Sequence, residues 1–335
     1  MIEIKKTRNI KHLKNDWQRI YSNNPNLVNN ASYEFVKTFS YSFKSKLKYI
    51  LKPNKKPIFY CFVENGQVNM ILPAFIQNNE IHTIYTLDYF DIPADVNLTG
   101  EKMLEYLNML AKKENKSIHI ERLNTKYNTY NKMEKLVNML PHSPCVEINF
   151  GESYDEYYNS LSKHARQNLR TAYNRAKTDN FEISFDVYSG KINKNLAKTL
   201  QNIYLNRRVG RYKNMNFIKK KLFALSDPIK NVCFNRDDNY VSVISFNKKP
   251  VAFMCGLIKN NALIVPRLAI DNNYSRYSVG IILVNETIKN LIGKKFNCLD
   301  LANGTETYKY QMGGGERLTT QYIVEVQDEK TSTIH

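Results

Sequence analysis

Segments with strand periodicity alternate with segments of helical periodicity along the chain, and the second half repeats the order of the first. In the first half, short strand-like segments surround a helical segment at 101–113, where apolar residues recur every three or four positions. In the second half, they surround a helical segment at 279–292. Such alternation is typical of domains in which helices flank a sheet. We therefore predict an α/β (α+β) protein whose two related domains each contain a mixed central sheet with flanking helices.

The length of 335 residues suits two domains, and the repeated order changes over near residue 150. We predict an N-terminal domain at 1–150, a C-terminal domain at 151–328 and a frayed polar tail at 329–335. The clearest local signal is Asn65-Gly66, which joins two strand-like segments and predicts a tight hairpin.

The chain is basic: 49 Lys and Arg against 31 Asp and Glu give a net charge of +18. Such a surface attracts polyanions, which include nucleotide cofactors, nucleic acid and anionic membranes. The accompanying excess of Asn, Ile and Tyr is what an AT-rich coding sequence produces. Part of the lysine content is therefore background, and only a subset of the basic residues is expected to be functional.

The five cysteines are odd in number and scattered, with no Cys-x-x-Cys pair, and no His-rich metal spacing is apparent. This pattern favours reduced core thiols and no metal. The first nineteen residues lack the apolar core of a signal peptide, and no apolar run is long enough to span a membrane. We expect a cytoplasmic protein without stable membrane insertion, with a basic face that can rest on the inner membrane surface.

One chemically suggestive segment is 271–281, which follows a strand and opens a helix. The first turn of a helix has unpaired N–H groups and a favourable dipole for anions. Arg276 adds a guanidinium, and Gly280 lets a phosphate approach the backbone. The segment is interpreted as a pyrophosphate cradle; an ordinary strand–turn–helix with a glycine near its start is the alternative.

The second segment is 300–315, which turns at Asn303-Gly304, continues into a short helix and ends in three glycines. On that helix, Tyr308 could protonate a departing thiolate and Lys309 could hold an anionic group. Alternatively, Tyr308 packs on the sheet and Lys309 is solvated. The glycines indicate a place where side chains would obstruct a ligand or another backbone.

The third segment is a basic helix at 161–177. Small and apolar residues recur along one side of this helix, at Leu161, Ala165, Leu169, Ala172 and Ala176. A second stripe carries basic residues, among them Arg166 and Arg170, which could grip phosphates or an acidic acceptor. A solvated face is the alternative, and tRNA binding would use the same stripe.

At these residues the chain resembles the GNAT acyl-CoA transferases, in which a pyrophosphate loop and helix precede an Asn…Tyr…Gly segment. It is similar in particular to the tandem-GNAT acetyltransferases of the cellulose-biosynthesis (CelD/BcsL) type, in the spacing Asp300-x-x-x-Gly304-x-x-x-Tyr308-Lys309. The basic helix and an aromatic and acidic stretch at 88–91 are also similar. The pyrophosphate loop lacks one glycine of the family pattern. More distantly, the chain resembles the Fem-type aminoacyl-transferases.

The resemblance implies a GNAT-type N- or O-acetyltransferase that uses acetyl-CoA as acyl donor and needs no metal. Its acceptor would be a cell-surface polysaccharide or envelope precursor such as an amino sugar. The implied residues are Tyr308 as general acid with Glu306 as a candidate base, Arg276, Ser278, Gly280 and Asn303 for the cofactor, and Lys309, Arg166, Arg170 and Asp91 for the substrate. Asp271 or a water chain is an alternative base. A Fem-type transferase that uses aminoacyl-tRNA in peptidoglycan synthesis and a non-catalytic binding module remain the alternatives.

Overall fold

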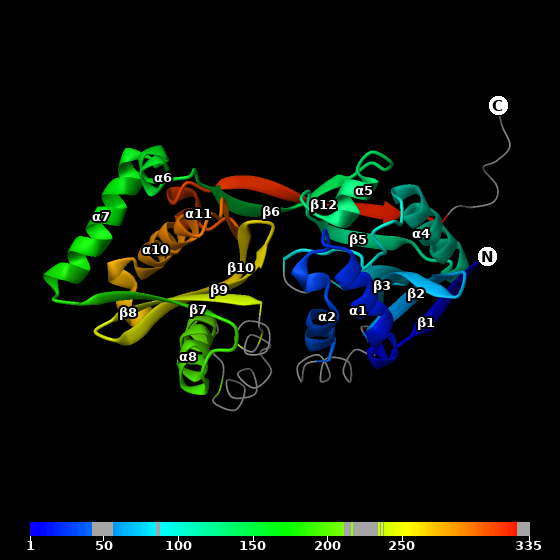
Figure 1. The fold of residues 1–335 in the computed structure, drawn as a ribbon, viewed down its shortest axis with the longest axis horizontal. Coiled ribbons are helices and arrows are strands. Elements are labelled where there is room, and N and C mark those ends of the chain that lie inside the picture. The colour runs from blue at the N-terminus through cyan, green and yellow to red at the C-terminus, as the bar shows by residue number, and fades with distance from the viewer. Residues whose placement is uncertain are drawn as a thin grey trace. The chain divides into compact units, whose positions relative to one another are not determined.

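A computed structural model describes residues 1–41, 56–84, 88–210 and 238–326, together with residues 216, 234 and 236. The chain forms two compact units. The first consists of Met1–Ser143 together with the chain from Leu318 onward, and the second is Pro144–Arg317. The helices and strands are drawn in Figure 1.

Among the described residues, the first unit contributes six neighbouring strands to the sheet, and one neighbouring pair of these strands is parallel. Its strands, in spatial order, are β1 (Ile2–Thr7), β2 (Ile58–Glu64), β3 (Gln67–Gln77), β4 (Glu80–Thr83), β5 (Ile118–Leu123) and β12 (Gly315–Val324). β4 and β5 run parallel, and the other neighbours are antiparallel. The predicted hairpin between β2 and β3 is confirmed, with positive φ at both Asn65 (54°) and Gly66 (78°).

Helices cover both faces of this sheet. The helices are η1 (Ile10–Leu13), α1 (Lys14–Asn23), η2 (Asn29–Ala31), α2 (Tyr33–Ser40), α4 (Gly100–Glu114) and α5 (Asn128–Met133). Trp17 of α1 packs against Phe59 and Ile71 of the sheet. On the other face, Leu107 of α4 packs against Ile118, as its periodicity predicts. Because both faces are covered, β2 is buried along nearly its whole length.

The described residues of the second unit also contribute six neighbouring strands to the sheet. In spatial order they are β7 (Ile183–Ser189), β8 (Asn239–Phe246), β9 (Lys249–Lys259), β10 (Ala262–Ile270), β11 (Cys298–Asn303) and β6 (Leu140–Asn149). Here β10 and β11 run parallel, and the other neighbours are antiparallel. The arrangement matches that of the first unit strand for strand, with a helix linking the two parallel strands in each case. The α/β architecture with two similar halves is therefore as predicted.

The sixth strand of each unit comes from the other half of the sequence. β6 follows the first five strands of the first unit, yet it pairs with β11 of the second. β12 is the last strand along the described sequence, yet it pairs with β5 of the first unit. The sequence placed 1–150 and 151–328 in separate domains, whereas the contacts divide the chain at 143 and again at 317. Periodicity alone could not reveal this, because it marks a strand without naming its partner.

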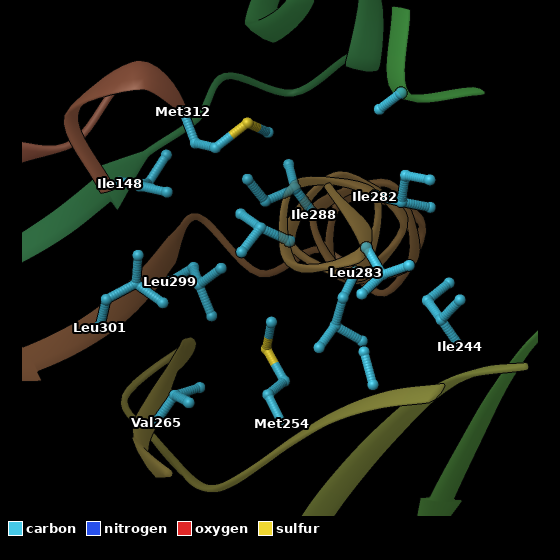
Figure 2. Packing of buried hydrophobic residues seen from close by; sticks show 14 of the residues in the cluster. Ile148, Ile244, Met254, Val265, Ile282, Leu283, Ile288, Leu299, Leu301 and Met312 are labelled. Carbon is cyan, nitrogen blue, oxygen red and sulfur yellow. The ribbon is translucent and has the colours of Figure 1, made fainter. Parts of the chain in front are cut away.

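The core of the second unit lies between its sheet and α10 (Figure 2). Its helices are α6 (Tyr154–Ser160), α7 (Lys163–Thr178), α8 (Lys194–Gly210), η5 (Asn272–Tyr277), α10 (Val279–Gly293) and α11 (Thr307–Gln311). Ile282, Leu283 and Ile288 of α10 pack on Met254 and Leu299 of the strands. α8 packs on β9 and β10, on the side of the sheet away from α10 (Figure 1). The predicted break near Ser160 separates α6 from α7.

Some predicted elements differ from the structure. The helix predicted at 130–140 ends at Met133, and β6 already begins at Leu140, where the sequence alternates around Pro141 and Pro144. The strand predicted at 81–87 ends at Thr83, and residues 85–87 lie outside the described residues. The predicted elements at 216–225 and 232–235 also fall largely outside them. In the described part of the chain, no helix combines the length and apolarity that crossing a membrane requires.

Candidate functional site

The parallel strands β10 and β11 separate after three residues. Ala262–Ile264 pairs with Cys298–Asp300, and no further pairs of these two strands occur in the described chain. β10 has a register shift after Ile264 and then continues along β9 to Ile270. β11 has a shift after Asp300 and pairs with β6 at Asn303. The facing edges beyond Ile264 and Asp300 are therefore not joined by a ladder, which leaves backbone groups of β10 on this side without a strand partner.

The left-handed conformation of Ala302 and the bonds of Asp300 accompany the register shift in β11. Ala302 has φ of +55°, a left-handed conformation that is uncommon for alanine. Its N–H donates to Oδ1 of Asp300 at 2.8 Å, and Oδ2 of Asp300 pairs with Arg317 at 3.2 Å. Arg317 also pairs with Glu147 at 3.3 Å. Asp300, part of the family-like spacing, therefore acts on the shape of β11 rather than on a ligand.

The segment after β10 leads into the N-terminus of α10, as expected. Asp271 caps the turn by accepting from the N–H of Asn273, and Ser278 precedes the helix with φ of +50°. Arg276 is 68% exposed, pairs with Asp179 at 3.3 Å and lies over the ring of Tyr277. The structure thus brings Arg276, Ser278 and Gly280 together around one helix N-terminus, where N–H groups lack helical partners.

Gly280 lies in open surroundings. A Cβ at this position would meet only Cγ2 of Ile270, at the ordinary contact distance of 3.6 Å. The protein itself therefore does not require a glycine here. The small residue leaves the backbone of the first turn of α10 accessible, which suits an anion.

Tyr308 lies on α11, partly buried, and packs against the core of the second unit. Burial and the nearby Glu306 carboxylate raise the pKa of its hydroxyl, and the positive charge of Arg207 only partly offsets them. The phenol is therefore protonated at neutral pH, so Tyr308 has a proton to donate and is unsuited to act as a base, but the raised pKa makes it a weaker acid than a free phenol. The packing expected in the alternative interpretation is also present, and it does not conflict with a role as acid.

Glu306 precedes α11 and has a half-exposed side chain. Partial burial raises the pKa of its carboxyl, but the Lys309 ammonium outweighs this and holds the pKa below its ordinary value. An ionised carboxylate of low basicity accepts protons weakly. Glu306 is therefore a poorer candidate for a general base than the sequence suggested, although it remains beside Tyr308.

Lys309 is the clearest correction to the expected site. Its side chain is 3% exposed, and its ammonium pairs with Glu306 at 3.1 Å. The same nitrogen donates to four consecutive carbonyl oxygens at 2.9–3.3 Å, those of Leu301, Ala302, Asn303 and Gly304. An ammonium has three protons, so these partners already saturate it. Lys309 therefore holds the loop after β11 in place and is not solvated, and its bonds within the chain leave it no donor for a substrate.

Asn303, Gly304 and Gly314 shape the chain on either side of α11. Asn303 is the last residue of β11 and pairs with Cys145, and Gly304 follows with φ of +110°. A Cβ at Gly314 would lie 2.6 Å from the carbonyl oxygen of Lys309 and 2.4 Å from Val146. This glycine is therefore needed where the chain leaves α11 and passes β6, and the obstruction comes from the protein itself.

Arg207 is a site residue that the sequence analysis missed. It lies on α8, donates to the carbonyl of Leu268 on β10, and is close enough for its charge to lower the pKa values of Glu306 and Tyr308. A helix more than ninety residues before α11 carries it, so no spacing rule links it to Tyr308. The adjacent pair Arg207-Arg208 near the end of a helix was the only available signal.

The basic stripe of α7 is present, with Ala165, Leu169 and Ala176 buried on the opposite side as predicted. Arg166 donates to the carbonyl of Asn159 at 3.0 Å, and the exposed Arg170 donates to Gln167 at 2.9 Å. Neither bond engages a buried acid, so both guanidiniums retain donors for an anion.

Asp91 is a second correction. Its side chain is buried in the first unit, where it accepts from the N–H of Val28 at 3.2 Å and from the N–H and hydroxyl of Thr129. Burial raises the pKa of this carboxyl to about 6. These bonds join the loop that carries Asp91, between β4 and α4, to Val28 and to Thr129 of α5, so Asp91 supports the fold of the first unit.

One known family matches part of the second unit. Residues 225–310 match the family described as an acetyltransferase (GNAT) domain, a range that spans β8–β11, α10 and most of α11. No curated protein sequence matches the chain. Residues 225–310 of the second unit are therefore similar to a GNAT acetyltransferase domain, and the first unit repeats the strand order of the second.

Solved structures share the fold over nearly the whole chain. FemX has a TM-score of 0.55 at 10% identity, with 96% of this chain and 97% of that chain covered. The C-terminal domain of a putative lysylphosphatidylglycerol synthetase from Agrobacterium fabrum has a TM-score of 0.57 at 10% identity, with 95% and 92% covered. A conserved protein of unknown function from Bacteroides thetaiotaomicron VPI-5482 has a TM-score of 0.55 at 13% identity, with 96% and 99% covered. At these identities the likeness concerns the fold alone.

Proposed function

We propose that the protein is an acyl-CoA-dependent acetyltransferase that acts on an amine or hydroxyl of a cell-surface polysaccharide or envelope precursor, such as an amino sugar. The observation that carries the proposal is the coincidence of the GNAT family match with a parallel strand pair that separates beside the N-terminus of a helix. The proposed acceptor class rests on the sequence resemblance to the cellulose-biosynthesis type.

The residues present fit coenzyme A as a cosubstrate. Arg276 offers a guanidinium to a pyrophosphate, Ser278 offers its hydroxyl, and the first turn of α10 at Gly280 offers backbone N–H groups. Beyond Ile264, β10 no longer pairs with β11, and this edge of β10 offers backbone groups to the amides of an extended pantetheine arm. The bound thioester supplies an activated acyl carbonyl.

In this proposal Tyr308 is the proton donor. The attack of an amine or hydroxyl on the thioester carbonyl forms a C–N or C–O bond and breaks the C–S bond. The acceptor gives up its own proton to solvent, and the departing thiolate takes a proton from a nearby acid. The hydroxyl of Tyr308 is protonated at neutral pH and can supply this proton, although its raised pKa makes it a weaker acid than a free phenol. Arg207 stabilises negative charge in the same region, because its guanidinium already acts on Glu306 and Tyr308. Cytoplasmic localisation is part of the proposal, since acetyl-CoA is a cytoplasmic metabolite.

A second candidate is a Fem-type transferase that uses aminoacyl-tRNA. It is favoured by the similarity of fold to FemX over both units and by the exposed basic face of α7. A polyanion would engage that face through many phosphate contacts, and its affinity would fall steeply with added salt.

Thermal-shift measurements with acetyl-CoA, free CoA and bulk tRNA distinguish the two candidates. A ligand at about 100 times its dissociation constant stabilises the folded protein by about 2.7 kcal/mol. The acetyltransferase is supported if acetyl-CoA and free CoA both stabilise the protein and if Arg276→Ala reduces this stabilisation. Stabilisation by tRNA alone, lost on added salt and in Arg166→Ala/Arg170→Ala, supports the Fem-type transferase. No stabilisation by any of the three removes both proposals and favours a non-catalytic module.

A further inference from the structure

Two histidines and a glutamate meet on the parallel pair β4 and β5 of the first unit. His82 on β4 lies directly opposite His119 on β5, and Glu80 lies two residues before His82. Side chains alternate between the faces of a strand, so all three residues share one face. Ile81 and Ile118 point to the other face, into the core beneath α4. The pairing register, rather than the sequence, therefore brings the three polar side chains together.

The distances within this cluster suit a single metal ion. Oε2 of Glu80 lies 3.4 Å from Nε2 of His82 and 3.4 Å from Nε2 of His119. One ligand atom from each residue lies within 4.8 Å of the others. A tetrahedral ion with bonds of about 2.0–2.1 Å holds its ligand atoms about 3.3–3.4 Å apart. The imidazole rings are stacked with centroids 4.6 Å apart, and rotation about the soft χ2 torsions directs both nitrogens toward one ion.

The two imidazole nitrogens lack other partners. Nε2 of His82 and Nε2 of His119 are both buried and make no hydrogen bond within the described part of the chain. Their contacts with Glu80 at 3.4 Å are longer than the usual N–H···O distance of about 2.9 Å. Buried polar atoms are normally satisfied, so two adjacent exceptions that face the same carboxylate call for a ligand between them.

We propose that Glu80, His82 and His119 bind one divalent transition-metal ion, with Zn²⁺ as the best fit. Two imidazoles and one carboxylate form a ligand set that zinc commonly uses, whereas Ca²⁺ and Mg²⁺ prefer oxygen ligands alone. The side chain of Glu80 is 40% exposed, against 13% for His82 and 18% for His119. The ion can thus enter past Glu80, and a water molecule can complete its coordination.

The bound ion ties β4 to β5. β4 has four residues, and only two register pairs join it to β5. Ligands from both strands make the ion a cross-link at this short pair, so its effect is on the stability of the first unit. The site lies outside the GNAT domain match, and it is independent of the proposed acetyl transfer.

The test uses the full chain, purified without a histidine tag and stripped with a chelator. Calorimetric titration with ZnCl₂ is expected to give one ion per chain, and saturating Zn²⁺ is expected to raise Tm by roughly 5–10 °C. Titration with Co²⁺ should give the visible absorption of a tetrahedral site with nitrogen and oxygen ligands and no thiolate band. His82→Gln and His119→Gln should abolish binding, and Glu80→Gln should weaken it at least tenfold. The exposed His12, changed to Gln, is the matched control.

Three results would overturn the proposal: no stoichiometric Zn²⁺ binding by the wild-type chain, binding that persists unchanged in His119→Gln, or loss of binding in His12→Gln. Glu80→Gln alters a partly exposed side chain and keeps its volume, so it retains the test if a histidine variant fails to fold. The Tm of each metal-free variant shows whether its fold is intact.

Discussion

Lys309 shows how a residue can match a functional pattern and still serve the structure. Its place after Tyr308 suggested a ligand-binding cation, but the ammonium lies beneath the loop after β11 and contacts its carbonyl oxygens. A sequence places a lysine on a helix without showing which way a flexible four-carbon chain extends. Asp91 misled in the same way, since its neighbours gave no sign that Thr129 and Val28 would enclose it.

Lys309→Met should therefore destabilise the protein rather than weaken ligand binding alone. It removes hydrogen bonds from a buried charge and leaves several carbonyl oxygens poorly satisfied, so the free energy of unfolding should fall by about 3 kcal/mol or more. Urea denaturation measures the change, and exposed Lys177→Met is the control. Unchanged stability with weaker acetyl-CoA binding would restore the role expected from the sequence.

Tyr308→Phe separates chemistry from packing. The ring and its contacts remain while the proton donor is lost, so turnover should fall about 10²-fold or more. Tm should change little, because no hydrogen bond from the Tyr308 hydroxyl is recorded among the described residues. Tyr310→Phe is a matched control on the same helix, as that hydroxyl is exposed and bonds to Glu316. Equal rates for wild type and Tyr308→Phe would remove the assignment of Tyr308 as acid.

Asp91 should make stability depend on pH. Its pKa is raised to about 6 in the folded protein, so folding favours the protonated form. The associated stability is present below the unfolded pKa of about 4 and is lost as pH rises through 6, a difference of about 3 kcal/mol. Asp91→Asn cannot titrate and lacks one acceptor for Val28, so it should be less stable throughout. The gap in Tm between wild type and variant should narrow from pH 4 to pH 7, and a constant gap would contradict this account.

At the scale of elements, strands and helices with strong periodicity could be predicted, whereas their irregularities could not. The hairpin at Asn65-Gly66, the break between α6 and α7, and α10 follow directly from local signals. The irregular conformation at Ala302 depends on the hydrogen bond to Asp300, and the Asp300 carboxylate is in turn held by its ion pair with Arg317, which lies 17 residues later in the sequence. Likewise, the separation of β10 from β11 depends on register, which a single sequence does not contain.

α10 offers a paired test of the anion site at its N-terminus. Gly280 and Gly293 lie in the same helix, and neither faces a close obstruction to an added Cβ. Each change to Ala should leave stability unchanged or raise it by up to about 1 kcal/mol. Only Gly280→Ala should weaken acetyl-CoA binding, roughly tenfold, because the added methyl group covers N–H groups of the first turn. Calorimetry that finds equal affinities for both variants would place the pyrophosphate elsewhere.

At the scale of the whole molecule, the two similar halves were predictable and their exchanged strands were not. Each half supplies five strands of one sheet in sequence order, which is what the repeated periodicity records. The sixth strand of each sheet comes from the other half, and no local signal at Leu140–Asn149 or Gly315–Val324 names its partner. The fold thereby makes the first unit depend on both ends of the chain.

This dependence predicts the effect of removing β12. Val324 and Tyr322 pack into the core that contains Ile118 and Ile120, and β12 supplies the antiparallel partner of β5. Truncation after Arg317 should therefore leave one edge of β5 unpaired and uncover part of that core, although β1–β5 are intact. Hydrogen exchange should show that the β5 amides that bond to β12 lose most of their protection. Truncation after Val326 keeps β12 whole and is the control. If the β5 amides stay protected after truncation at Arg317, the first unit is complete without β12. The division of the chain at 317 then does not describe a folding unit.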